Sequence, residues 1–260
     1  MSMHLHSKGV RPTAVSFTAA LVFALASAVA PSASATPNDV LGSFQLRDCV
    51  EVSAIVSVPP ERAAATLPDG YTSSSFIGLP GGPGIPGNSS LLMGVETCQS
   101  GTIDGVPVDG PVTFGERVLS VDRKDARPGY HFYAVEQVTD NQQIHDLMRT
   151  AGFDIALVPG VGATADAVGG VSEGGSVRIV DEAPVPRLPS PLGQVSIWKD
   201  TENSRSSLRL TVHRPTAQAG IGHVTAEPNS PIASLMGTET ATGIGAINRF
   251  DFDAQVEMVR

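Results

Sequence analysis

Residues 250–258 read Phe250-Asp251-Phe252-Asp253-Ala254-Gln255-Val256-Glu257-Met258, in which apolar and polar residues alternate without interruption. Side chains of a β-strand point alternately to the two faces of a sheet, so this stretch predicts a strand with one face on a core and the other toward water. The same alternation appears in residues 50–58 and 208–213. Residues 112–122 and 130–139 have the composition of two further strands. These patterns predict a mainly β protein.

Two short segments have helical patterns instead. Residues 60–67 have a proline in the first turn of a predicted helix, and Pro68 and Gly70 end that helix. Residues 141–151 carry apolar residues three and four positions apart, and either Asp140 or Asn141 is a favourable N-cap for them. The Gly- and Pro-rich segments 78–90 and 159–176 are predicted loops. The fold class that we expect is therefore mainly β (α+β), with a few short helices.

The N-terminal segment 1–35 has the pattern of an export signal. Lys8 and Arg11 precede an apolar run over residues 14–30, and Ala33-Ser34-Ala35 offers a small-residue cleavage site. The alternative is an uncleaved membrane anchor. The apolar run is shorter than the roughly 20 residues that span a bilayer and consists largely of weakly hydrophobic alanine. We therefore expect a secreted or extracytoplasmic protein whose single domain is residues 36–260.

The charge of the mature chain limits its partners. The full chain has a formal net charge of −9, and cleavage removes Lys8 and Arg11 but no acidic residue, which leaves −11. Binding to nucleic acid or to an anionic membrane surface requires a basic face. No later segment is long and apolar enough to span a bilayer. The expected partner is a small molecule, with neither nucleic acid nor a membrane involved after cleavage.

Cys49 and Cys98 are the two cysteines of the chain. In an oxidising compartment two thiols that have no other cysteine partner usually form a disulfide, so we expect a bond between Cys49 and Cys98. The loop-entropy model gives such a bridge a stabilisation of about 4 kcal/mol. The spacing of the cysteines and histidines fits no metal site, and none is predicted. Asn88-Ser89-Ser90 is a glycosylation sequon, which matters only in a host that modifies such sites.

One motif suggests a hydrolase. Residues 170–174 read Gly-Val-Ser-Glu-Gly and match the G-x-S-x-G nucleophile elbow, with His213 or His223 downstream as a base for Ser172. An elbow needs a strand before the serine and a helix after it. Residues 175–180 have a strand pattern instead, so a serine hydrolase is the least favoured of our functional hypotheses.

Three glutamates, Glu96, Glu116 and Glu136, each interrupt an apolar strand. A carboxyl group that points into a barrel could act as a general acid or base. Alternation also allows each of them to point outward into water. The outward orientation is favoured for any single one, because charged groups are seldom buried without a partner.

Two further residues are candidates for ligand binding. His131 stands near Tyr133, Glu136 and His145 without metal-ligand spacing, so it is interpreted as a surface or pocket-lining histidine. Arg117 could clamp a carboxylate ligand, although a solvated surface arginine is the simpler interpretation. No cofactor is predicted.

The order of these elements resembles a known family. Val56-Ser57-Val58-Pro59-Pro60-Glu61-Arg62-Ala63, followed by Leu67-Pro68-Asp69-Gly70, resembles the opening of acetoacetate decarboxylase-like proteins. Residues 227–237 and the last strand are similar to the closing segment of that superfamily. The resemblance implies a single antiparallel β-barrel or cone with an internal ligand cavity and short helices outside it.

The resemblance fails at the catalytic lysine. Acetoacetate decarboxylases carry Gly-Phe-Pro-Lys, whose lysine forms a Schiff base with the ketoacid, whereas the matching place here reads Gly152-Phe153-Asp154-Ile155. The mature chain has only Lys124 and Lys199, which we expect in polar, turn-like segments where the pKa of an amine is not lowered. Glu96 is the nearest match to the glutamate of the family's active site.

These observations lead to three functional hypotheses. The first is a secreted β-barrel that binds a small, mainly apolar ligand and has no Schiff-base decarboxylase activity. The second is a secreted acid/base enzyme that acts on a carbonyl compound through cavity carboxylates. The third is the serine hydrolase.

Overall fold

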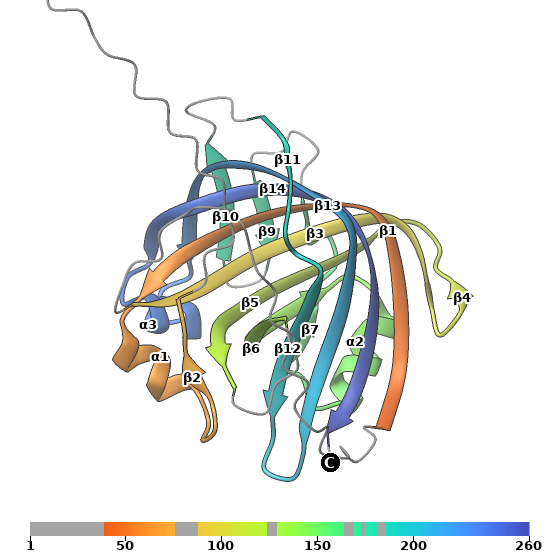
Figure 1. Cartoon of the computed structure of the whole chain (residues 1–260), viewed down its shortest axis with the longest axis horizontal. Coiled ribbons are helices and arrows are strands. Elements are labelled where there is room, and N and C mark those ends of the chain that lie inside the picture. Colours follow the sequence, from red (N-terminus) through yellow and green to blue (C-terminus); the bar gives the residue numbers. More distant parts are fainter. Residues whose placement is uncertain are drawn as a thin grey trace, which may run out of the picture. The chain divides into compact units, whose positions relative to one another are not determined.

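The computed structural model describes residues 39–75, 88–123, 129–163, 169–172, 175–180 and 186–259. The predicted export signal and Lys124 lie outside these residues. Figure 1 shows a fold dominated by long strands. The helices are α1 (Pro60–Thr66), α2 (Gln142–Thr150) and α3 (Pro231–Met236). The strands are β1 (Asp39–Val58), β2 (Thr72–Ser73), β3 (Ser89–Ile103), β4 (Val106–Pro107), β5 (Val112–Asp122), β6 (Tyr130–Thr139), β7 (Ile155–Leu157), β8 (Gly162–Ala163), β9 (Gly169–Ser172), β10 (Gly175–Val180), β11 (Leu188–Pro189), β12 (Gln194–Asp200), β13 (Arg205–Ala226) and β14 (Thr240–Val259).

The main strands close into a barrel. Their order is β12-β6-β5-β3-β1-β14-β13, and β12 also pairs with β13, which closes the ring. These pairings are antiparallel except for β12 with β6, and β7 joins the edge of β6 in parallel as well. Beyond the ring, the C-terminal half of β13 pairs with β10, which continues through β9 to β8. The predicted β-barrel is therefore confirmed, with a mixed rather than purely antiparallel sheet.

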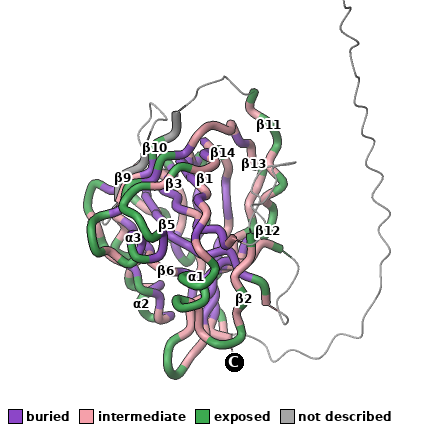
Figure 2. Tube along the Cα trace, turned by 90° about the vertical axis from the view of Figure 1, so that its left-hand side faces the viewer, coloured by how far each residue is buried: buried purple, intermediate pink, exposed green. Residues whose placement is uncertain are grey.

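Both faces of the barrel wall are covered. The inner face carries the first apolar core, which includes Phe44, Leu208 and Phe252 and receives Ile144 and Met148 from α2. The outer face carries a second core, in which Val52, Met93 and Val224 pack with side chains of α1 and α3. In Figure 1, α1 and α3 lie together, away from α2. In Figure 2 the buried residues, drawn in purple, follow the long strands of the barrel wall.

The second core changes the interpretation of the strand at residues 50–58. Its alternation is real, but the polar residues Glu51 and Ser53 are as well buried as the apolar residues between them. Val52, Ala54, Val56 and Val58 point to the outer core, whereas Glu51, Ser53 and the apolar Ile55 point into the barrel. A strand buried on both faces therefore displays a pattern that usually indicates a water-exposed face.

The local predictions agree with the structure in most places. The strands at 112–122 and 130–139 have the expected bounds, and Asn141 caps α2 by accepting a hydrogen bond from the Ile144 amide. The loop predicted at 159–176 is wrong in part, because β8, β9 and the start of β10 lie within it. Helix α3 was not predicted. No helix in the described part of the chain is long and apolar enough to cross a membrane.

Candidate functional site

A cavity lies inside the barrel, against the inner face. Its volume is about 80 Å³. A single water molecule needs roughly 10–15 Å³ on the same scale, so the cavity has room for a small molecule. Its polar lining consists of Glu51, Ser53, Glu96, Glu116 and Asn248. Its apolar lining consists of Ile55, Leu92, Phe132, Leu192, Val195, Leu210, Val212, Ile244, Ala246, Phe250 and Phe252.

Much of the apolar lining is incompletely buried. Ile55, Leu92, Leu210, Val212 and Ile244 point into the barrel, yet each retains intermediate exposure to solvent. Ligand pockets are usually concave and mostly apolar, with a few polar groups that fix the orientation of the ligand. The cavity has this composition.

The polar end of the cavity is built on four neighbouring strands. Glu51 of β1 lies directly opposite Glu96 of β3 and Asn248 of β14. Residues opposed in an antiparallel pair point to the same face, so these three side chains meet inside the barrel. The Asn248 amide donates to Glu51 Oε2 over 2.6 Å and to Ser53 Oγ over 3.2 Å. This amide therefore holds the Glu51 carboxyl group in place.

Glu116 adds a third carboxyl group to the same end, and Gly94 leaves the space for it. Gly94 of β3 lies directly between Ser53 on β1 and Glu116 on β5. A Cβ atom at Gly94 would stand 2.6 Å from Glu51 Oε1, because the Glu51 side chain covers this position. Only glycine leaves room for that arrangement, which brings the Glu51 carboxyl group over the strand position beside Glu116. The three glutamates form a carboxyl cluster, the name used below for Glu51, Glu96 and Glu116.

The environment favours the protonated forms of the carboxyl cluster. Burial raises the pKa of Glu51 to about 7, although hydrogen bonds with Asn248 and Ser53 act in the opposite direction. Burial, together with the charge of Glu51, raises the pKa of Glu116 to about 8. Burial and the charges of Glu116 and Glu51 raise the pKa of Glu96 well above its usual range. At neutral pH the cluster therefore holds both protons and charge.

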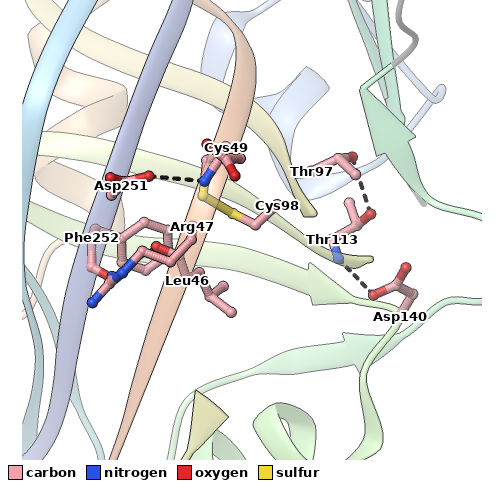
Figure 3. The surroundings of a disulfide bond; sticks show 10 residues. Leu46, Arg47, Cys49, Thr97, Cys98, Thr113, Asp140, Asp251 and Phe252 are labelled. Carbon is pink, nitrogen blue, oxygen red and sulfur yellow. Dashed lines mark hydrogen bonds between the residues drawn. A yellow bond between two sulfur atoms is a disulfide. The ribbon is translucent and has the colours of Figure 1, made fainter. Parts of the chain in front are cut away.

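The predicted disulfide is confirmed and adjoins the carboxyl cluster. Cys49 and Cys98 are directly opposed on β1 and β3, with their sulfur atoms bonded and their Cα atoms 3.9 Å apart. Figure 3 shows the bond joining the two strands. Both half-cystines belong to the inner core, and the next opposed pair on the same face is Glu51 and Glu96.

A buried amide lies next to the cluster. Gln137 of β6 is directly opposite Glu116 and therefore shares the inner face with it. The side chain is 2% exposed, and neither its oxygen nor its nitrogen has a hydrogen-bond partner among the described residues. Buried polar atoms normally find a partner, so this amide is an exception in the structure.

Of the three glutamates predicted as candidate catalytic residues, two lie in the cavity and one does not. Glu96 and Glu116 point into the cavity, so the favoured outward orientation is wrong for both. Glu136 lies on the outer face, opposite Arg117, and its Oε2 stands 3.5 Å from Arg117 Nη1. Arg117 is 2% exposed and is therefore no surface arginine. Neither Arg117 nor Glu136 lines the cavity.

His131 lies away from the cavity as well. Its neighbour Phe132 points inward, and His131 itself accepts a hydrogen bond from Trp198 Nε1 over 3.2 Å. In the described part of the chain no three His, Cys, Asp or Glu side chains are arranged to hold a metal ion. A bulge in β6 also places Tyr133 and Glu136 on one face, contrary to strict alternation.

The backbone around Ser172 does not form a nucleophile elbow. Ser172 ends β9, and the chain returns as β10 in an antiparallel hairpin rather than entering a helix. His213 pairs with Asp253 over 2.9 Å, and His223 contacts Thr242. The expectation of strand at residues 175–180 is confirmed, and it removes the main support for the hydrolase.

The two positions important for Schiff-base chemistry differ in environment. Ile155 is 3% exposed in the inner core, directly opposite Gln137. Lys199 lies in β12 rather than in a turn, and its Nζ donates to the Ala134 carbonyl oxygen over 3.3 Å. Burial lowers the pKa of Lys199, while the charges of Asp154 and Glu136 act in the opposite direction. Our prediction of a polar, turn-like setting for Lys199 is therefore wrong, although the lysine does not line the cavity.

Sequence reasoning missed Glu51 and Asn248, which complete the polar end. The cysteines offered a signal for Glu51. If Cys49 and Cys98 are opposed on antiparallel strands, the residue two positions after Cys49 lies opposite the residue two positions before Cys98. This register places Glu51 opposite Glu96. Asn248 offered no comparable signal, because only the pairing of β14 with β1 brings it beside Glu51.

These features define a class of protein: a closed β-barrel with an internal cavity that has a mainly apolar lining and a cluster of carboxyl groups at one end. Solved structures identify the fold as that of acetoacetate decarboxylase and related enzymes. An acetoacetate decarboxylase matches with a TM-score of 0.54 at 7% identity, over 83% of this chain and 87% of its own. The enduracididine biosynthesis enzyme MppR, solved in complex with pyruvate, matches with a TM-score of 0.52 at 12% identity, over 90% and 95%.

A third structure supports the same assignment. The acetoacetate decarboxylase of Legionella pneumophila matches with a TM-score of 0.51 at 11% identity, over 90% of this chain and 93% of its own. No protein-family model matches this sequence, and no curated protein is similar to it in sequence. At these identities the likeness establishes the acetoacetate decarboxylase-like fold, and function has to be argued from the cavity.

Proposed function

We propose that this protein is exported and binds a small, mainly apolar molecule inside its barrel, with the polar group of that molecule against the carboxyl cluster. The observation that carries the proposal is the cavity, whose apolar wall ends in Glu51, Glu96, Glu116 and Asn248. The export pattern of residues 1–35 and the disulfide support a location outside the cytoplasm.

The proposed role does not include Schiff-base decarboxylation. The sequence has Ile155 where the resemblance places the lysine, and this side chain is buried among apolar neighbours. The described lysine, Lys199, stands outside the cavity lining. Incubation with acetoacetate and borohydride, followed by mass spectrometry of the intact chain, should give no covalent adduct. A borohydride-trapped adduct on Lys124 or Lys199 would contradict this part of the proposal.

The binding proposal is tested by native mass spectrometry of the protein secreted by its host, which should retain a small molecule. Thermal shift with a panel of small apolar alcohols, ketones, acids and amines provides the second measurement. If nothing is retained and no compound of the panel raises Tm, the binding proposal fails.

A second candidate function is acid/base catalysis on a carbonyl compound. The specific observation in its favour is that three carboxyl groups line one end of the cavity, where burial raises their pKa values. One protonated carboxyl group could donate to a carbonyl oxygen while an ionised one removes the neighbouring C–H proton. Exchange of ketone α-hydrogens with deuterated water, followed by NMR, distinguishes the two functions. Binding alone gives no exchange above the buffer rate.

A further inference from the structure

The described lining of the cavity is acidic without a balancing cation. It includes Glu51, Glu96 and Glu116 and no lysine, arginine or histidine among the described residues. The groups that face these carboxyls from the neighbouring strands are Asn248, Ser53 and the amide of Gln137. Among the described lining residues, the titratable groups are therefore the three carboxyls themselves.

Two carboxyl groups of the cluster receive no hydrogen bond from the described residues. Asn248 donates to Glu51, whereas neither Glu96, which is only 7% exposed, nor Glu116 has such a donor. A carboxyl group that is largely removed from water without gaining a hydrogen bond is costly. The Gln137 amide beside Glu116 is fully buried, and its oxygen and nitrogen have no hydrogen-bond partner among the described residues. Hydrogen-bonding groups of Glu96, Glu116 and Gln137 are therefore available at this end of the barrel interior.

We propose that the ligand of this cavity is a small aliphatic amine, with its ammonium group among Glu51, Glu96 and Glu116 and its alkyl part along the apolar wall. This inference rests on the binding function proposed above and names the chemical class of the ligand. An ammonium group has three N–H donors and no acceptor, which matches three carboxyl groups that accept. Each such hydrogen bond is charge-assisted and stronger than a neutral one.

Other ligand classes fit this end less well. A carboxylate would meet three groups that carry the same charge when ionised. An alcohol or ketone could form one or two hydrogen bonds with the protonated cluster and would leave other acceptors unused. A divalent cation also prefers carboxylate oxygens but requires several of them at fixed short distances, so calcium is included in the experiment below.

Amine binding and protonation of the cluster are linked. The free cluster retains protons near neutral pH, because burial and mutual repulsion oppose ionisation. An ammonium ion favours the charged carboxyl forms, so binding displaces protons from the cluster. Affinity should therefore rise between pH 6 and pH 8, a range in which an alkylamine, like lysine, stays protonated.

The experiment is isothermal titration calorimetry of the full mature protein with hexylamine, hexanol, hexanoate and calcium chloride. Titrations at pH 6 and pH 8, in two buffers of different ionisation enthalpy, report affinity and the number of protons released. We expect hexylamine to bind at least about tenfold more tightly than hexanol, the ratio that one charge-assisted hydrogen bond supplies. We also expect proton release with hexylamine and none with hexanol.

Variants locate the ammonium group. Glu96→Gln keeps the shape of the side chain and should weaken hexylamine by about tenfold or more, while hexanol binding changes little. Glu116→Gln serves the same purpose if Glu96→Gln does not fold. Glu61→Gln is the matched control, because Glu61 is exposed in the first turn of α1.

The outcomes are separable. Hexanol or hexanoate binding as tightly as hexylamine would overturn the amine proposal and leave the binding function standing. Tighter binding of calcium than of hexylamine would overturn it in favour of a metal. Failure of all four compounds here and of every compound in the thermal-shift panel would refute the binding function itself, and the amine proposal with it.

Discussion

Glu51 and Glu96 face each other directly across β1 and β3, on the strand face that also carries the Cys49–Cys98 bond one opposed pair away. Like charges directly opposite in an antiparallel pair are destabilising. The disulfide adjoins this unfavourable pair and fixes the register of the strands that create it. The carboxyl cluster is thus maintained by the surrounding fold, against the local preference of its own side chains.

The first prediction concerns stability and pH. A carboxyl group whose pKa is higher in the folded than in the unfolded state stabilises the fold fully at low pH, and this contribution is lost as pH rises through the folded value. For Glu51, with a pKa raised from 4.5 to about 7, the loss is on the order of 3 kcal/mol. Denaturant unfolding should therefore show stability falling from about pH 5 to pH 8.

The control is the triple variant E51Q/E96Q/E116Q, in which this decline should largely vanish. Asp251 and Asp253 have pKa values below the usual range, so their contribution has the opposite sign and is lost only in more acidic solution. A wild-type stability that stays flat between pH 5 and pH 8 would contradict the raised pKa values of the cluster.

The second prediction concerns the disulfide. Reduction should lower the free energy of unfolding by about 4 kcal/mol, because the bond closes a loop across a sequence separation of 49 residues. Denaturant unfolding with and without reductant measures the effect. The C49A/C98A variant should be unaffected by reductant, and an equal response of that variant would show that the reductant acts elsewhere.

The third prediction concerns Gly94. An added Cβ atom would stand 2.6 Å from Glu51 Oε1, so Gly94→Ala must displace that carboxyl group and should cost about 1–3 kcal/mol. The same change in an E51A background should cost much less, because the obstructing group is gone. Thermal unfolding of the four proteins gives the coupling energy.

Gly193→Ala is the matched control for adding a Cβ atom, since its nearest neighbour would be 4.0 Å away. It should change Tm little. Equal costs for Gly94→Ala with and without Glu51 would place the conflict in the backbone instead of the carboxyl group.

The fourth prediction concerns Arg117. This side chain is 2% exposed and pairs with Glu136, so Arg117→Met leaves a partly buried carboxylate without that partner and should cost about 3 kcal/mol. Arg149→Met removes a comparable pair with Asp154 that is largely exposed, and it should change stability by less than about 0.5 kcal/mol. Denaturant unfolding compares the two. Similar losses would mean that burial does not strengthen the Arg117 pair.

Much of the fold could be predicted from local pattern, because alternation and capping are local properties. The strands at 112–122 and 130–139 and the capped helix behind Asn141 follow directly from their own residues. The Gly-rich strands β8 and β9 carry few apolar side chains, so their residues look like a loop until they pair with a neighbour.

The site was less predictable because it depends on which side of each strand is covered. Alternation at Glu96 and Glu116 gives the spacing of the two faces but does not say which face is inside. Polar residues of a strand are usually assigned to the outer, water-exposed face, but here a second apolar core covers the outer face of the barrel. The sequence of residues 50–58 gives no indication of that core. The disulfide register was the one sequence signal that could have brought Glu51 into the site.

Three strands extend past both apolar cores. β1 and β14 each have 20 residues and β13 has 22, and each contributes side chains to the inner core and to the outer core. The two cores therefore share the backbone of these three strands. The barrel and the strands folded over it should melt in one cooperative transition, and the amide hydrogens of β1, β13 and β14 should exchange with solvent only when the whole domain unfolds.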